Sequence, residues 1–128
     1  MPEKKTIERA RKDKREGKAP TTQAGEFVHE EIEHIREGKH GARSAKQAIA
    51  IGLSKARRAG VKLAPPKKGT TSSRTRRQAQ RDLARAKSSR KASPARSRAS
   101  SRALKREGRS AASRTALSRQ ARSAARKR

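Results

Sequence analysis

Large apolar side chains gather in one stretch of this chain. Nine of its 13 Leu, Ile, Val and Phe residues lie between positions 20 and 64. Within that stretch, apolar residues recur every three or four positions from 24 to 35 and again from 45 to 59. This spacing places each set on one face of a helix. The pattern therefore predicts two amphipathic helices, joined by residues 39–43, that pack together as a helical hairpin.

The ends of both predicted helices carry typical capping residues. The first helix begins at Thr21 or Thr22, either of which is a suitable N-cap, and ends at Gly38. The second follows Ser44 in a capping-box pattern and ends in a Schellman turn at Gly60.

Small residues along the second helix predict a close approach to its partner. Glycine within a helix costs about 1 kcal/mol relative to alanine, and close packing would offset that cost at Gly52. A hairpin of about 40 residues is near the lower size limit for an independent domain. We expect marginal stability, improved by weak self-association or by a partner.

The outer faces of the two helices differ in charge. The second helix is basic, with Lys46 and Arg57 on one flank and Arg43 just before its start. The first helix carries glutamates at helical spacing opposite its apolar stripe, namely Glu26, Glu30, Glu33 and Glu37. Because carboxylates and phosphates repel each other, we expect the acidic face to point towards solvent or the N-terminal arm. The basic flank would then face a polyanion.

Residues 1–19 form a basic N-terminal arm. Residues 3–16 are good helix formers, and Gly17 and Pro20 end the segment. Its one large apolar side chain is Ile7. A helix with so little to bury is expected to fray.

Residues 65–128 form a low-complexity tail. It holds 22 Lys and Arg against two acids, with 13 Ala and 12 Ser. Repulsion between the cations opposes helix formation, so we expect a largely disordered tail. Three stretches, 75–87, 101–107 and 110–126, are able to become helical when phosphates neutralise them. The predicted fold class is therefore all-α, with a hairpin module at residues 20–64 between a basic helical arm and a basic tail.

Composition and charge narrow the classes of function. The 128 residues carry a net charge of +27 and include no Cys, Trp or Tyr. Disulfides, thiolate zinc sites and base-stacking platforms are therefore excluded. Too few large apolar residues are present to wall a substrate pocket, so we expect no enzyme and no cofactor. With no apolar run of membrane-spanning length and no secretory signal, we expect a cytoplasmic protein without a membrane partner.

Two histidines lie among the acidic residues of the first helix. A helical zinc-protease motif needs histidines four positions apart, whereas His29 and His34 are five apart. That spacing separates them by about 140° around a helix. We therefore expect surface histidines and no metal site.

The hairpin also fits the helix-turn-helix pattern, with residues 44–59 as the recognition helix. Arg43 and Lys46 would then stand at the positive end of that helix, where phosphates bind. The alternative is a hairpin that only scaffolds the tail or dimerises. The module has no Asn and no third packing helix to support base recognition.

The positive charge predicts a polyanionic partner. Lys and Arg neutralise phosphates and release counterions whatever the base sequence. The candidate contacts combine the hairpin flank with the tail: Arg43, Lys46, Arg57, Arg58, Lys67, Lys68, Arg74, Arg76, Arg77, Arg81, Arg90, Lys91, Arg96, Arg98, Arg102, Lys105, Arg106, Arg126, Lys127 and Arg128.

Residues 38–61, with the sequence GKHGARSAKQAIAIGLSKARRAGV, resemble a family of small basic bacterial proteins that carry a domain of unknown function. A looser similarity extends over most of residues 1–87. The resemblance implies a bacterial cytoplasmic protein and no established activity. The tail is similar in composition to the tails of bacterial linker-histone-like proteins, and Ser93-Pro94-Ala95-Arg96 resembles the Ser-Pro-basic turns of linker-histone tails.

These features together predict a nucleoid-associated, histone-like DNA-binding protein that contacts phosphates without base specificity. Two alternatives stay open. One is an RNA- or ribosome-associated protein, since Arg-rich segments also fold on structured RNA. The other is a protein–protein adaptor that uses the acidic helix face.

Overall fold

The computed structural model describes residues 2–86 and 93–126 as an all-α protein. The helices in these ranges are α1 (Lys4–Arg15), α2 (Pro20–Arg36), α3 (Ala45–Arg58), α4 (Ser73–Arg85), α5 (Pro94–Lys105), the short 3-10 helix η1 (Ser110–Ala112) and α6 (Arg114–Arg126). The described residues contain no strand, only a single bridge between Lys68 and Thr71. The predicted fold class is confirmed.

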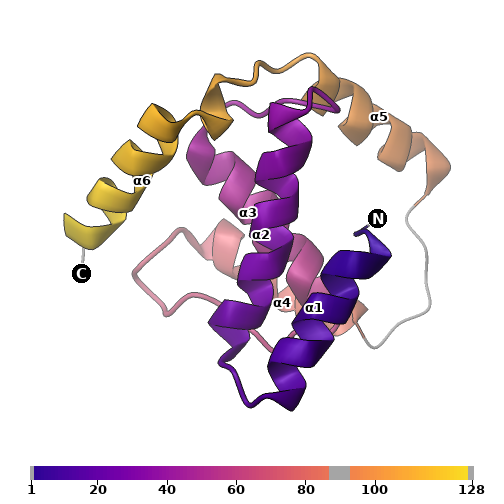
Figure 1. Ribbon diagram of the computed structural model, residues 1–128, viewed down its shortest axis with the longest axis vertical. Helices are drawn as coiled ribbons and strands as arrows, with labels where there is room; N and C mark the ends of the chain where they lie inside the picture. The colour runs from indigo at the N-terminus through magenta and orange to yellow at the C-terminus, as the bar shows by residue number, and fades with distance from the viewer. Residues whose placement is uncertain (1, 87–92, 127–128) are drawn as a thin grey trace.

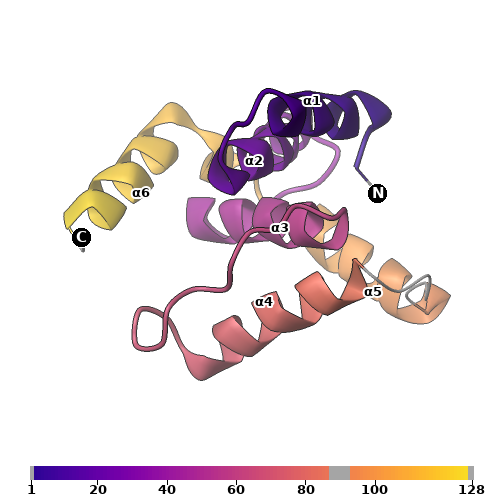
Figure 2. The same ribbon diagram turned by 90° about the horizontal axis from the view of Figure 1, so that it is seen from below.

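Helix α3 is the middle layer of the molecule (Figures 1 and 2). It packs against α2 on one side and against α4 on the other, and α1 covers the far side of α2. Helices α5 and α6 lie at the periphery. The predicted hairpin is thus the centre of a larger helical assembly, to which both flanking segments contribute.

The hairpin helices end largely where the sequence predicts. The Ser44 hydroxyl accepts the Gln47 amide at 3.1 Å, and the Gln47 side chain accepts the Arg43 amide. Residue Gly60 follows α3, with the Val61 amide donating to the Ala56 carbonyl at 3.0 Å in a Schellman pattern.

The predicted N-cap of the first hairpin helix is wrong by two or three residues. Helix α2 begins at Pro20, with Ala19 as the N-cap and no side-chain cap. Proline suits this position, because its fixed φ fits the first turn and its missing N–H would have had no helical partner. Neither Thr21 nor Thr22 caps the helix.

The N-terminal arm is not a separate fraying segment. Ala10 is buried and Ile7 packs beside it, in a cluster with Ala24, Phe27 and Ala56. The Thr6 hydroxyl also donates to the Glu30 carboxylate at 3.1 Å. Helix α1 therefore contributes to the core that α2 and α3 build.

A second core cluster depends on the tail. Ala111 and Ala112 of η1 are buried against Ile35 of α2 and Ala48 of α3. The amides of the α2–α3 loop also donate to the tail, Gly41 to the Leu104 carbonyl and Ala42 to the Gly108 carbonyl. The sequence predicted a largely disordered tail, whereas the structure describes a tail that packs on the hairpin and completes its core.

Two of the tail helices begin earlier than the sequence suggests: the predicted stretch 75–87 corresponds to α4 from Ser73, and the stretch 101–107 to the C-terminal half of α5. The predicted stretch 110–126 is divided into η1 and α6, and α6 begins only at Arg114. Ser93 caps α5, its hydroxyl accepting the Arg96 amide at 3.2 Å, and Pro94 takes the first helical position. The Ser-Pro-basic sequence is therefore a helix start rather than an isolated turn.

The predicted close approach at Gly52 is confirmed. A Cβ atom there would lie 2.6 Å from the Cα of Val28 and 2.9 Å from its backbone nitrogen. These are backbone atoms that cannot rotate away, so only glycine allows α2 and α3 to meet at this distance.

We expect the substitution Gly52→Ala to destabilise the protein by about 1–3 kcal/mol, because overpacking at a backbone contact outweighs the gain in helix propensity. The matched control is Gly25→Ala, at an exposed position of α2 where an added Cβ meets nothing within 4 Å. That control should be neutral or gain about 1 kcal/mol. Urea unfolding followed by circular dichroism measures both. Equal stabilisation of the two variants would contradict the close approach.

Candidate nucleic-acid interface

A groove of about 570 Å³ runs between α3 and α4. Four of the predicted contacts line it, namely Lys46 and Arg57 from α3 and Arg74 and Arg81 from α4. The side chains of Lys46, Arg74 and Arg81 are exposed, whereas Arg57 is buried. The structure therefore brings residues from the hairpin and from the tail to one basic groove.

The one acid of α4 is turned into the groove floor. Asp82 is 2% exposed, and it accepts hydrogen bonds from Ser54 at 2.7 Å and Gln78 at 3.1 Å. The Arg58 side chain lies 3.8 Å away, close enough for an ion pair. Asp82 thus connects α4 to α3. The charged side chains that remain on the outer side of α4 are all cationic.

Arginines on α4 share one exposed face. Arg74, Arg77 and Arg81 are spaced by three and four positions, which aligns them along the helix. Arg76 lies off this face, where its Nε donates to the Pro66 carbonyl at 3.1 Å. Arg76 therefore fixes the linker that enters α4.

The sequence predicted that Arg57 shares the exposed flank of Lys46, and this prediction is wrong. The Arg57 side chain is buried, with Nε donating to the Leu63 carbonyl at 3.1 Å and a terminal nitrogen donating to the Ala64 carbonyl at 3.0 Å. Burial lowers the pKa of the Arg57 guanidinium, and Asp82 partly opposes that shift. Arg57 is a structural residue that holds the chain after α3.

The remaining predicted contacts are spread over the surface. Arg43 is exposed at the start of α3, and Arg58 at its end. Exposed cations of the linker, α5, its C-cap and α6 are Lys67, Lys68, Arg96, Arg98, Arg102, Lys105, Arg106 and Arg126. Four predicted contacts, Arg90, Lys91, Lys127 and Arg128, lie outside the described residues.

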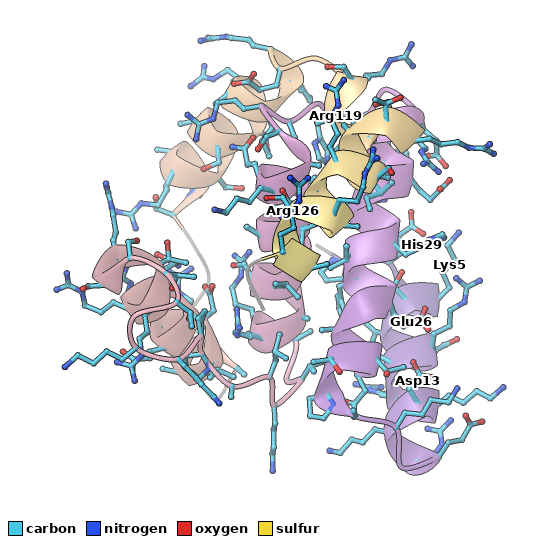
Figure 3. All side chains as sticks on the ribbon, turned by 90° about the vertical axis from the view of Figure 1, so that its left-hand side faces the viewer. Lys5, Asp13, Glu26, His29, Arg119 and Arg126 are labelled. Carbon is cyan, nitrogen blue, oxygen red and sulfur yellow. The ribbon has the colours of Figure 1, made fainter. Side chains whose placement is uncertain are left out.

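Helices α5 and α6 repeat the pattern of α4. Figure 3 shows Arg119 and Arg126 on α6, and Arg122 lies between them at the spacing found in α4. On α5 the corresponding exposed residues are Arg98, Arg102 and Lys105. The prediction missed Arg119 and Arg122, although the spacing of three and four was present in the sequence.

The sequence predicted that four glutamates of the first hairpin helix form one outer acidic face, and the structure does not contain that face. Glu30 is buried against α1, where it accepts the Thr6 hydroxyl and the Glu3 amide. Glu33 pairs with Arg36 at 3.4 Å, and Glu37 with Lys39 at 3.3 Å. The acidic surface is therefore divided and partly neutralised.

A polar cluster lies where α1, α2 and the α2–α3 loop meet. Glu31 is fully buried, and its carboxylate is bonded by the Lys55 ammonium and approached by His34 and His40. His34 is 14% exposed, so the prediction of a surface histidine is wrong there. His29 is exposed and lies on the outer side of α2, as predicted (Figure 3).

The same cluster holds the groups that could ligate a metal. One ligand atom from each of Glu31, His34 and His40 lies within 4.8 Å of the others, and the same is true of Glu3, Glu30 and His34. The hydrogen bond from His34 lowers the pKa of Glu3, and Lys5 adds to this shift. Sequence spacing missed the cluster because His40 lies beyond the end of α2, and only the loop returns it to Glu31.

The fold and these surfaces define a small, strongly basic all-α protein. A family model covers residues 3–68, so the chain belongs to the family of unknown function DUF6496. The matched residues span α1 to α3 and the start of the linker, while α4, α5 and α6 lie beyond them. No curated protein and no solved structure matches the chain. Within the described residues, no helix has the length and apolar character needed to cross a membrane.

Arg57 and Arg43 offer a test of structural against surface roles. We expect Arg57→Gln to destabilise the protein by about 1–3 kcal/mol, because two carbonyl acceptors lose a charged donor. The exposed control Arg43→Gln should change stability by less than about 0.5 kcal/mol. Thermal unfolding measures both, and a neutral Arg57→Gln would show that its two bonds do not hold the chain after α3.

Proposed function

We propose that this protein binds nucleic acid through phosphate contacts, as a nucleoid-associated, histone-like protein of the bacterial cytoplasm. The observation that carries the proposal is the separation of charge between interior and surface. Among the described residues, four acids are buried, namely Asp13, Glu30, Glu31 and Asp82, but the only buried basic residue is Arg57. The outer surface is therefore more cationic than a net charge of +27 alone implies.

The cationic stripes of α4, α5 and α6 strengthen the proposal. Like charges three or four positions apart destabilise a helix by a few tenths of a kcal/mol per pair. Each stripe brings together three cations, with no acid on the exposed side of its helix. A phosphate backbone relieves this repulsion and releases its counterions at the same time. Binding and tail ordering should therefore favour each other.

Contacts to phosphates account for these surfaces better than base recognition does. A recognition helix needs a free side to enter the major groove. Helix α3 is instead covered by α2 on one side and by α4 on the other (Figure 2). Its N-terminal end remains accessible with Arg43 and Lys46, and this end suits a phosphate.

Duplex DNA is the partner we favour over RNA. Sequence-specific recognition of single-stranded RNA relies on aromatic side chains that stack on bases. Phe27 is the only Phe, Tyr or Trp residue in the sequence, and it is buried in the core. An RNA- or ribosome-associated role is the second candidate, because arginine stripes also fit an RNA backbone. The protein adaptor role loses support, because Glu30 is buried and Glu33 and Glu37 are paired.

Salt dependence tests the phosphate mechanism. For random-sequence duplex DNA, the log of the affinity should fall linearly with log salt, with a slope steeper than about −6. Replacing Arg74, Arg77 and Arg81 by Gln should make that slope shallower by about 3, one for each lost phosphate contact. Fluorescence anisotropy across a salt series gives both slopes.

The matched control removes three charges from α1 instead, through Arg9→Gln, Lys12→Gln and Arg15→Gln. These positions are exposed and lie outside the proposed surface. This variant should keep a slope close to that of the unmodified protein. Equal losses in both triple variants would mean that net charge, and not the α4 surface, determines binding.

Nuclease treatment separates the two nucleic-acid candidates. The protein purified at low salt from its own cells should carry bound nucleic acid that DNase removes and RNase leaves. Loss of that material to RNase alone would replace the nucleoid role with the RNA-associated one.

A further inference from the structure

The polar cluster around Glu31 has an arrangement that the nucleic-acid surface does not explain. Glu31 comes from the middle of α2, His34 from the next turn, and His40 from the loop before α3. The Glu31 side chain is fully buried, while His34 and His40 are only 14% and 15% exposed. Two imidazoles and a carboxylate thus share one nearly closed site.

Hydrogen bonds on the outer sides of both rings fix where their protons lie. His34 Nε2 is 3.2 Å from Glu3 Oε1, and a carboxylate can only accept, so this nitrogen carries a proton. His40 Nδ1 is 3.0 Å from the Gly41 carbonyl oxygen, which also only accepts. In the neutral rings, His34 Nδ1 and His40 Nε2 therefore present lone pairs.

Both of these nitrogens lie near the Glu31 carboxylate. His34 Nδ1 lies 4.0 Å from Glu31 Oε1, and His40 Nε2 lies 3.2 Å from Glu31 Oε2. Glu31 Oε2 is buried and has no hydrogen-bond partner. The Lys55 ammonium donates to Oε1, but between Oε2 and the neutral His40 ring there is no donor, which is unfavourable unless a cation occupies that space.

We propose that Glu31, His34 and His40 form a binding site for a divalent transition metal, of which Zn²⁺ is the best fit. Imidazole and carboxylate ligands suit zinc, whereas magnesium and calcium prefer oxygen ligands alone. Histidines that bind metals usually donate their second N–H to a carboxylate or a backbone carbonyl, and here Glu3 and Gly41 supply those acceptors.

The geometry requires only small movements. The ligand atoms lie within 4.8 Å of one another. Ligands of a tetrahedral zinc ion at about 2.0–2.2 Å are roughly 3.5 Å apart, so the side chains must close by about 1 Å. The three residues leave the fourth position to water.

Lys55 is compatible with this site. Its ammonium bonds Glu31 Oε1, which leaves Oε2 as the oxygen directed at His40. A bound metal would add charge on the opposite oxygen and join α2 to the loop before α3. Since Glu3 also holds His34, the site connects the start of α1 to the same point. The metal would therefore stabilise the three-helix arrangement.

Metal titration of the full-length protein tests the proposal. The protein is stripped with a chelator, freed of nucleic acid, and titrated with Zn²⁺ by calorimetry and with Co²⁺ by visible absorption. We expect one saturable equivalent, Co²⁺ bands typical of nitrogen and oxygen ligands, and a rise of several degrees in Tm with Zn²⁺. A lack of saturable binding would overturn the metal site. The cation shared by the imidazoles and the carboxylate would then be a proton.

Three variants locate the site. His40→Ala and Glu31→Gln should each weaken Zn²⁺ binding at least tenfold and abolish the rise in Tm. Glu31→Gln keeps the shape of the side chain and an oxygen for Lys55, so it remains informative if His40→Ala does not fold. The control His29→Ala removes an exposed histidine from the same helix and should bind as the unmodified protein does. Full affinity in a folded Glu31→Gln variant, or an equal loss in His29→Ala, would overturn the proposal.

Discussion

The close contact between α2 and α3 at Gly52 is the constraint on which the rest of the structure depends. The chain has 13 large aliphatic or aromatic core candidates, too few to fill a wide space between helices. Because the Val28 backbone lies directly against Gly52, the space between the helices is narrow. Alanines such as Ala24, Ala48 and Ala56 are large enough to fill it. Dispersion contacts at short distance replace the bulk that a leucine-rich core would supply.

Acidic side chains supply the second layer of organisation. Glu30 joins α2 to α1, Glu31 joins α2 to Lys55 of α3, and Asp82 joins α4 to Ser54 of α3. Each acid is buried, and each connects two helices. Because these carboxylates are used inside the molecule, the surface carries a larger excess of arginine and lysine over acidic residues. Stability of the fold and the affinity proposed for phosphates thus arise from the same distribution of charge.

The region matched by the family model is not structurally independent of the tail. Residues 3–68 contain α1, α2 and α3, but Ala111 and Ala112 from the tail complete the core around Ile35. Gly41 allows this contact, because a Cβ there would lie 2.0 Å from the Glu107 carbonyl oxygen. The tail therefore meets the hairpin at its loop, beside the histidine cluster. A metal bound there would act close to the point where the tail is attached.

The sequence by itself determined the helical class, the hairpin and most of its ends. These depend on local physics: apolar spacing, the Ser44 cap and the turn at Gly60 act within a few residues. It also predicted the close approach at Gly52 and the cationic character of α4. The exposed arginines of α6 were predictable from spacing alone, although only Arg126 was identified.

Only the tertiary structure decided which charged groups face inward. Helical periodicity places Glu30 opposite the apolar stripe and leaves solvent and the N-terminal arm as two possible sides, but it does not reveal that α1 buries Glu30. Likewise, Arg57 shares a helical flank with Lys46, yet the chain after α3 turns back and uses its guanidinium. His40 approaches Glu31 through a loop, so no helical spacing relates the two residues. Burial of a charge depends on contacts between segments that are distant in sequence, and the local sequence pattern does not contain information about those contacts.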